Sequence, residues 1–116
     1  MATFDQRGQT VNNQYNAARD INFNSVENKD DVIRELKKLL EEVTKATKSG
    51  AFKDEVAVDL EAEVKKALIQ AEKPEPNKKS ILEYLATAKE LIEGLTSATG
   101  LVTLLIQATE AVRRLL

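Results

Sequence analysis

Apolar residues recur at intervals of three and four in four successive runs between residue 29 and the C-terminus. Side chains at this spacing lie on one face of an α-helix, so each run predicts an amphipathic helix. Glycines and prolines, which end helices, interrupt the pattern between the runs. We therefore expect a mainly α fold, an antiparallel bundle of three to four helices with short loops. The expected helices cover residues 30–48, 54–72, 76 or 77 to about 94, and 101–116.

The last run is apolar around more than half of its circumference, which is wider than a surface helix needs. Either this helix is central to the bundle, or one of its faces contacts another molecule. The second alternative predicts a secondary interface formed by Leu101, Leu104, Leu105, Ala108, Val112 and Leu115. A third alternative is a membrane, because wide apolar helices that end in arginines, here Arg113 and Arg114, can lie on lipid. The polar residues Thr103, Gln107 and Glu110 interrupt a uniform lipid face, so burial is the simpler expectation.

The first 28 residues differ in composition from the rest of the chain. They contain most of its asparagine and glutamine, and lysine first appears at Lys29. We expect two parts, an N-terminal self-assembly arm at residues 1–28 and a helical bundle at residues 29–116.

Side chains in the arm alternate between two faces, which is the pattern of a β-strand. The alternation begins at Val11, has one amide-rich face, and resumes at Ile21 and Phe23 after the small pair Ala17 and Ala18. An arm with so few apolar residues cannot form a core of its own, so an extended β arm or hairpin here has to pair with something else.

Pairing between identical arms accounts for the amides. When identical strands stack in register, Asn and Gln side chains hydrogen-bond to their copies above and below. Lysine, which soluble proteins use to block strand edges, is absent from the arm. The alternative is a disordered polar tail. The residues expected to form the self-assembly site are Val11, Asn12, Asn13, Gln14, Tyr15, Asn16, Arg19, Asp20, Ile21 and Phe23.

The arm also resembles a known kind of bacterial segment. Residues 9–21, read as Q-x-V-x-N-Q-x-N-x-A-x-D-I, are similar to short N-terminal segments of the type Q-x-V-x-x-Q-x-N-x-A-G-D-I that precede helical or signalling domains in bacterial proteins. Some of those segments are similar to prokaryotic amyloid signalling motifs, which are compared with the animal RHIM. The resemblance implies homotypic strand stacking. Arg19 stands where glycine is usual, which costs on the order of 1 kcal/mol if the backbone there needs a positive φ.

Residue types that carry most protein chemistry are missing or scattered. The chain has no Cys and no His, which removes disulfides, the usual zinc ligands and the commonest general base. Asp59, Glu61 and Glu63 are close in sequence, but spacings of two place them on different sides of a helix. Tyr84, beside Leu85 on an apolar face, is expected at the rim of the core or inside it. We expect no catalytic, metal or cofactor site, and no enzyme.

Charge favours a solvated helical surface over nucleic-acid binding. The formal net charge is -2 and no basic stripe is present, so nucleic acid is not an expected partner. Opposite charges four residues apart predict ion pairs on the helices, for example Asp30 with Arg34 and Glu61 with Lys65. The N-terminus lacks the basic and apolar regions of a signal peptide, so we expect a cytoplasmic protein.

These features favour a structural, self-assembling protein whose partner is itself, as a homo-oligomer or filament held by pairing of the arm. The alternative is a bacterial signalling adaptor or cell-death effector. In that case the arm recruits a protein with a matching segment, and the last helix acts on a membrane.

Overall fold

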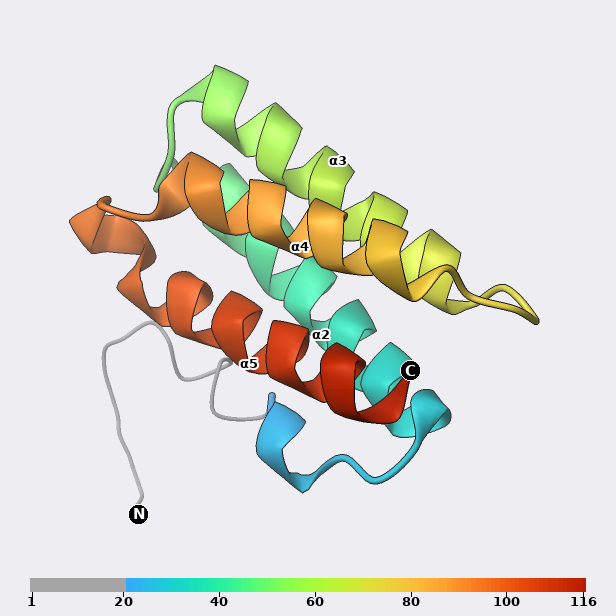
Figure 1. Ribbon diagram of the computed structural model, residues 1–116. Coiled ribbons are helices and arrows are strands. Elements are labelled where there is room, and N and C mark those ends of the chain that lie inside the picture. The colour runs from blue at the N-terminus through green and yellow to red at the C-terminus, as the bar shows by residue number, and fades with distance from the viewer. Residues whose placement is uncertain (1–20) are drawn as a thin grey trace, which may run out of the picture.

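Residues 21–116, the part of the chain that the computed structural model describes, fold into four α-helices and two short 3-10 helices (Figure 1). This confirms the mainly α bundle expected from the periodicity and fixes the number of its α-helices, expected as three to four, at four. Each α-helix begins and ends within a few residues of its expected bounds. In chain order the elements are η2 (Phe23–Ser25), α2 (Lys29–Lys48), α3 (Asp54–Ala71), α4 (Lys78–Ile92), η3 (Thr96–Ala98) and α5 (Thr99–Leu115).

The helices form a ring in which each one packs on the next, and α5 closes the ring by packing on α2. Helices α3 and α5 therefore lie on opposite sides of the bundle (Figure 1). Short connections make successive helices antiparallel. The 3-10 helix η2 lies against α5, which brings the N-terminal end of the described chain onto the last helix.

Side chains from every helix meet in one core, and the largest fully buried ones come from the apolar positions of the four periodic runs, with one addition from η2. They are Phe23, Leu36, Leu39, Leu60, Ile81, Leu85, Ile92, Leu101 and Leu105, with Val32, Val43 and Val64.

Local residues explain where the helices begin and end. The Asn28 side chain accepts a hydrogen bond from the Asp31 backbone N–H at 2.9 Å and caps α2. Asn77 caps α4 in the same way. The turn after α2 contains Gly50 at φ +79°, a left-handed conformation that glycine adopts without steric cost. By contrast, Lys53 starts α3 without a side-chain cap.

The last helix is central to the bundle. Leu101, Leu105, Ala108 and Val112 have no exposed area, Leu104 is 5% exposed, and Leu115 is partly buried against the core. The expectation of a secondary interface at these six residues is therefore corrected, because a helix that packs against α2, α4 and η2 needs apolar side chains around most of its circumference. No helix within residues 21–116 is long and apolar enough to cross a membrane.

Candidate self-assembly site

The structure describes only two of the residues expected to form the self-assembly site, because it describes the chain from residue 21 onward. Val11, Asn12, Asn13, Gln14, Tyr15, Asn16, Arg19 and Asp20 lie outside the described residues, so the β-strand expected there stays a prediction. Ile21 and Phe23 lie inside them, at the start of the described chain. The structure therefore shows how the arm joins the bundle.

Ile21 and Phe23 belong to the core of their own chain. Ile21 is 6% exposed and Phe23 is 1% exposed. Phe23 starts the 3-10 helix η2, where the Asn22 side chain accepts a hydrogen bond from the Asn24 N–H at 3.0 Å and bends the backbone. The expectation that these two residues continue a strand and are buried between chains is corrected here, since local capping by Asn22 and the packing of η2 on α5 favour intramolecular burial.

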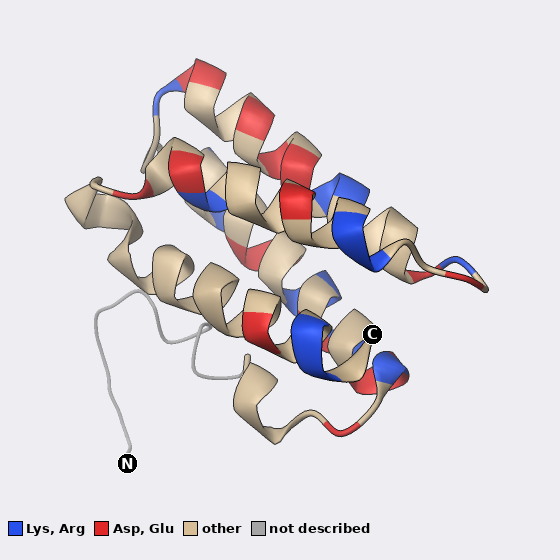
Figure 2. Cartoon of the chain, viewed as in Figure 1, with Lys and Arg blue, Asp and Glu red and all other residues tan. Residues whose placement is uncertain are grey.

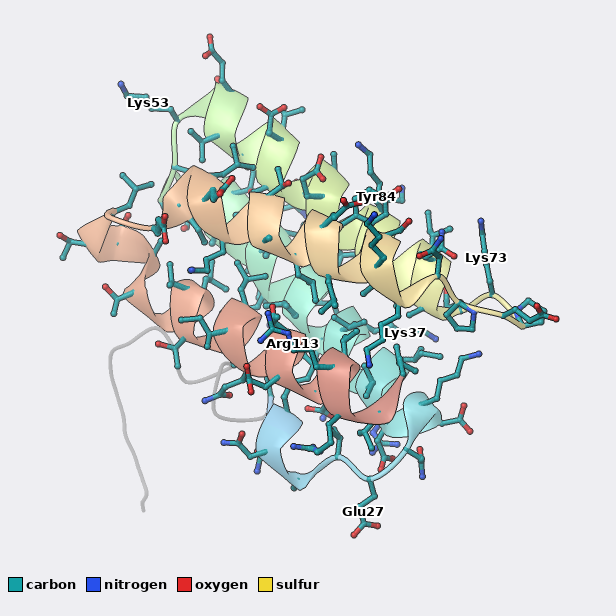
Figure 3. The ribbon with its side chains drawn as sticks, in the orientation of Figure 1. Glu27, Lys37, Lys53, Lys73, Tyr84 and Arg113 are labelled. Carbon is teal, nitrogen blue, oxygen red and sulfur yellow. The ribbon has the colours of Figure 1, made fainter. Side chains whose placement is uncertain are left out.

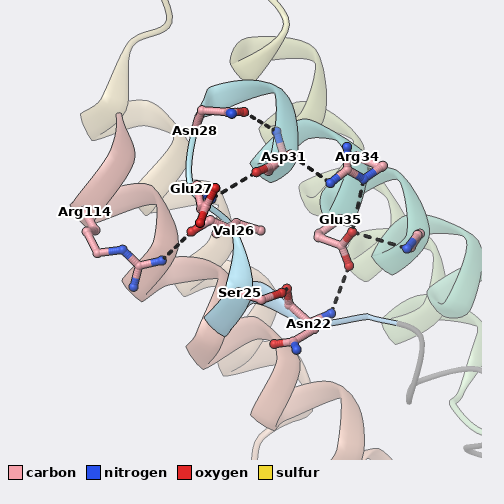
Figure 4. Close-up of polar contacts among 10 residues, drawn as sticks. Asn22, Ser25, Val26, Glu27, Asn28, Asp31, Arg34, Glu35 and Arg114 are labelled. Atoms are coloured by element: carbon pink, nitrogen blue, oxygen red, sulfur yellow. Dashed lines mark hydrogen bonds and ion pairs between the residues drawn. The ribbon is translucent and has the colours of Figure 1, made fainter.

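A buried carboxylate fastens the same segment to α2. Glu35 is 5% exposed, and its Oε1 accepts a hydrogen bond from the Asn22 backbone N–H at 2.9 Å (Figure 4). Its Oε2 lies 3.6 Å from Nε of Arg34 and 3.3 Å from Nζ of Lys38. Two cations and a backbone donor thus offset the cost of burying this charge.

Two further contacts hold residues 26–28. The Arg114 guanidinium, at the end of α5, donates to the carbonyl of Val26 at 3.2 Å. The Glu27 backbone N–H donates to Oδ2 of Asp31 at 3.0 Å (Figure 4). We call residues 21–28 the anchor segment, because contacts from both α2 and α5 fix it on the bundle.

Asp31, in the first turn of α2, holds the C-terminal end of the anchor segment through its carboxylate. Arg34 donates to its Oδ1 at 2.8 Å, where the sequence had suggested Asp30 as the partner of that arginine. The pKa of Asp31 is lowered, first by the hydrogen bond from the Glu27 backbone N–H and then by the one from Arg34. These contacts therefore favour the ionised carboxylate over the protonated one.

The sequence pointed to Arg114 only for a contact with lipid and did not single out Glu35, although both bind backbone groups of the anchor segment. A signal was present for Glu35, an acidic residue inside the apolar run of α2, directly before Leu36. Glu42, seven residues further along the same helix, is likewise 6% exposed. Nothing in the local sequence marks Arg114 as a contact of the anchor segment, because its partner is a backbone carbonyl 88 residues away.

The acidic side chains of Asp59, Glu61 and Glu63 on α3 point in different directions. This agrees with the prediction from their spacing. Glu61 accepts a hydrogen bond from Thr44 on α2 at 3.3 Å, whereas Glu63 accepts one from Lys66 on its own helix at 3.2 Å. Asp59 is exposed. Across residues 21–116 no group of three or more acidic side chains is placed to hold a metal ion.

Tyr84 lies at the rim of the core, one of the two places expected for it. It is partly buried on α4, and Nζ of Lys66 lies 5.8 Å from the centre of its ring (Figure 3). A cation at this distance over an aromatic ring stabilises the contact between α3 and α4.

Two shallow grooves open on the surface beside α5. One, of about 330 Å³, lies at the turn between α4 and α5 and is lined by Gly94, Leu95, Thr96, Thr99, Val102 and Thr103. The other, of about 250 Å³, runs between α4 and α5 and is lined by Ala86, Lys89, Glu90, Ile106, Thr109, Glu110 and Arg113. Neither lining contains a nucleophile held by a general base, so neither has the geometry of a catalytic site.

Comparison with protein-family models gives no match, and neither do comparisons with curated proteins and with solved structures.

Proposed function

We propose that this chain is a structural, self-assembling protein whose N-terminal arm pairs with the arms of other copies as β-strands. The observation that carries the proposal is the amide-rich alternation from Val11 to Asn16, which is free of lysine and has too few apolar residues for a core. With Ile21 and Phe23 assigned to the bundle, the pairing arm is residues 1–20.

The anchor segment supports this proposal by giving the arm a fixed origin. Ile21 is buried, and the next backbone N–H, that of Asn22, is bound to Glu35 at 2.9 Å. An arm that leaves a rigid body at a fixed point loses less freedom on pairing than one on a flexible linker. Stacked arms would therefore carry their bundles in a regular array, as a homo-oligomer or filament.

A second candidate is a signalling adaptor, in which the arm recruits a different protein that carries a matching segment. The resemblance of residues 9–21 to the bacterial Q-x-V-x-x-Q-x-N-x-A-G-D-I segments favours this candidate. Both candidates use the same strand pairing, and they differ in whether the partner is identical. A pull-down with the arm fused to an unrelated carrier separates them, since self-assembly predicts capture of this chain alone, whereas the adaptor predicts capture of a second protein with a matching segment.

Proline substitution in the arm tests the strand pairing. Proline cannot donate to a strand ladder, so Val11→Pro and Tyr15→Pro should each abolish large assemblies seen by negative-stain microscopy and light scattering. Ala2→Pro, outside the alternating stretch, is the matched control and should assemble as the unmodified chain does. Assemblies that persist unchanged in both Val11→Pro and Tyr15→Pro would overturn the proposal.

A further inference from the structure

The outer face of α3 exposes an apolar ridge. Val58, in the second turn of the helix, is 67% exposed, and Ile69, in its last turn, is 51% exposed, although both are large apolar residues. Ala62 lies between them at a spacing of four and seven residues, which places all three on one side of the helix. Helix α3 packs on α2 and α4 and lies across the bundle from α5, so this side faces outward (Figure 1).

Charge along the same face changes sign at the middle of the helix. The first half carries the exposed acids Asp54, Glu55 and Asp59, and bases follow in the second half and just beyond it (Figure 2). Lys53 and Lys73 mark the two ends in Figure 3. The exposed bases of the second half are Lys65, Lys66 and Lys73.

Contacts within the chain leave the acids of this face uncompensated, whereas Lys66, among the bases, pairs with Glu63. Among the described residues, Asp54, Glu55 and Asp59 form no ion pair. The expected pair of Glu61 with Lys65 is likewise not formed, since Glu61 contacts Thr44 instead. Glu55 and Asp59 are like charges four residues apart, which destabilises an isolated helix.

The helix dipole explains part of this pattern. Acids in the first turn interact favourably with the positive end of the dipole, which accounts for Asp54 and Glu55. The effect ends within that turn, so it explains neither Asp59 nor the exposed Ile69. Both Asp59 and Ile69 are explained if a second surface covers this face. That surface would place bases opposite the acids and an apolar residue opposite each end of the ridge.

We infer that a second copy of this chain packs on the outer face of α3, with the two α3 helices antiparallel about a twofold axis between residues 63 and 64. This arrangement places Val58 of each copy against Ile69 of the other. Asp54 of each helix then lies opposite Lys73 of its neighbour, and Asp59 lies near its Lys65 and Lys66, whereas a parallel pair would set acid against acid. Glu72, which lies opposite Glu55, is paired with Lys37 of its own chain. Near the axis, Lys65 of each copy lies opposite Ala62 of the other, whose small side chain leaves room for it.

This contact uses residues remote from the N-terminal arm. It is self-complementary and therefore closes as a pair, in contrast to a stack of arms that can grow. Together, the two contacts would join neighbouring bundles in pairs along an assembly. The pair can be tested whether or not the arm assembles.

Cysteine cross-linking tests the orientation directly, because the chain has no cysteine of its own. Full-length Val58→Cys and Ile69→Cys proteins are oxidised separately and as a mixture. The antiparallel pair predicts that disulfide-linked dimers form severalfold faster in the mixture than in either protein alone. Cross-linking that is faster in the separate proteins indicates a parallel pair, and equal slow cross-linking in all three samples indicates no pair; either result overturns the inference.

Charge reversal tests the complementarity. In the full chain carrying Val11→Pro, which separates this contact from the arm, Ile69→Glu and Asp59→Lys should each raise the dimer dissociation constant at least about tenfold in sedimentation equilibrium. Mixing the Asp59→Lys protein with a Lys66→Glu protein should restore much of the loss. Ile106→Glu is the matched control, since Ile106 is 45% exposed on α5 away from this face. If the control weakens the dimer as much as Ile69→Glu, or if no variant changes it, the outer face of α3 is not the interface.

Discussion

Phe23 decides how the N-terminal residues divide between arm and bundle. It is 1% exposed and packs with α5, so Phe23→Ala should lower the free energy of unfolding by about 3–5 kcal/mol through lost burial and the cavity left behind. Urea denaturation followed by circular dichroism measures this change. If Phe23 served pairing between chains instead, the same substitution would reduce assembly and leave unfolding of the isolated chain unchanged.

A surface substitution provides the control for this experiment. Leu95, in the turn between α4 and α5, is 40% exposed, so Leu95→Ala should change the free energy of unfolding by no more than about 0.5 kcal/mol. An equal loss in both variants would mean that the truncation itself, rather than burial of the aromatic ring, is responsible.

Asp31 makes stability depend on pH at the anchor segment. Because its pKa is lower in the folded chain than in the unfolded chain, its stabilising contribution is present above the ordinary aspartate pKa and is lost as the pH falls through the folded value. Asp31→Asn should therefore be less stable than the unmodified chain at pH 7, with a difference that shrinks in acid. Thermal melts between pH 7 and pH 3 measure this difference, and a gap that stays constant with pH would contradict the role of the charge.

Helix caps set the stability of single elements, and this chain offers a matched pair of tests. Asn77 caps α4, so Asn77→Ala should cost about 1 kcal/mol, whereas Lys53→Ser, at the uncapped start of α3, should gain about 0.5–1 kcal/mol. Lys53 already has the extended backbone that a cap residue requires, with φ -64° and ψ 150°. Denaturant midpoints of the two variants and the unmodified chain measure both changes in stability. If Lys53→Ser lowered the stability, the Lys53 side chain would itself stabilise the start of α3.

At the same scale, the sequence predicted the helices well because their determinants are local. The apolar spacing, the prolines after α3 and the glycine after α2 act within one or two turns, and the observed bounds follow them. The sequence could not show whether the wide apolar face of α5 is buried within the bundle or contacts another molecule. Burial of α5 depends on α2, α4 and η2 together, and those contacts join residues distant in sequence.

For the whole molecule, the least predictable feature was the boundary between arm and bundle. Composition changes near Asn28, but the fold takes up residues from Ile21 onward, because Glu35 and Arg114 bind backbone groups of the anchor segment. Backbone groups look alike in every sequence, so such partners carry no compositional signal. A truncation designed from composition would thus remove part of the core.

We propose that residues 1–20 assemble the chains, while residues 21–116 fold as the bundle. Sedimentation velocity of the full chain and of a chain lacking residues 1–20, each with its thermal melt, tests it most directly. The claim predicts that the truncation removes the large species and leaves a helical body with a similar melting temperature, whereas removal of residues 1–28 also lowers that temperature because Phe23 is lost. Large species that persist without residues 1–20 would contradict it.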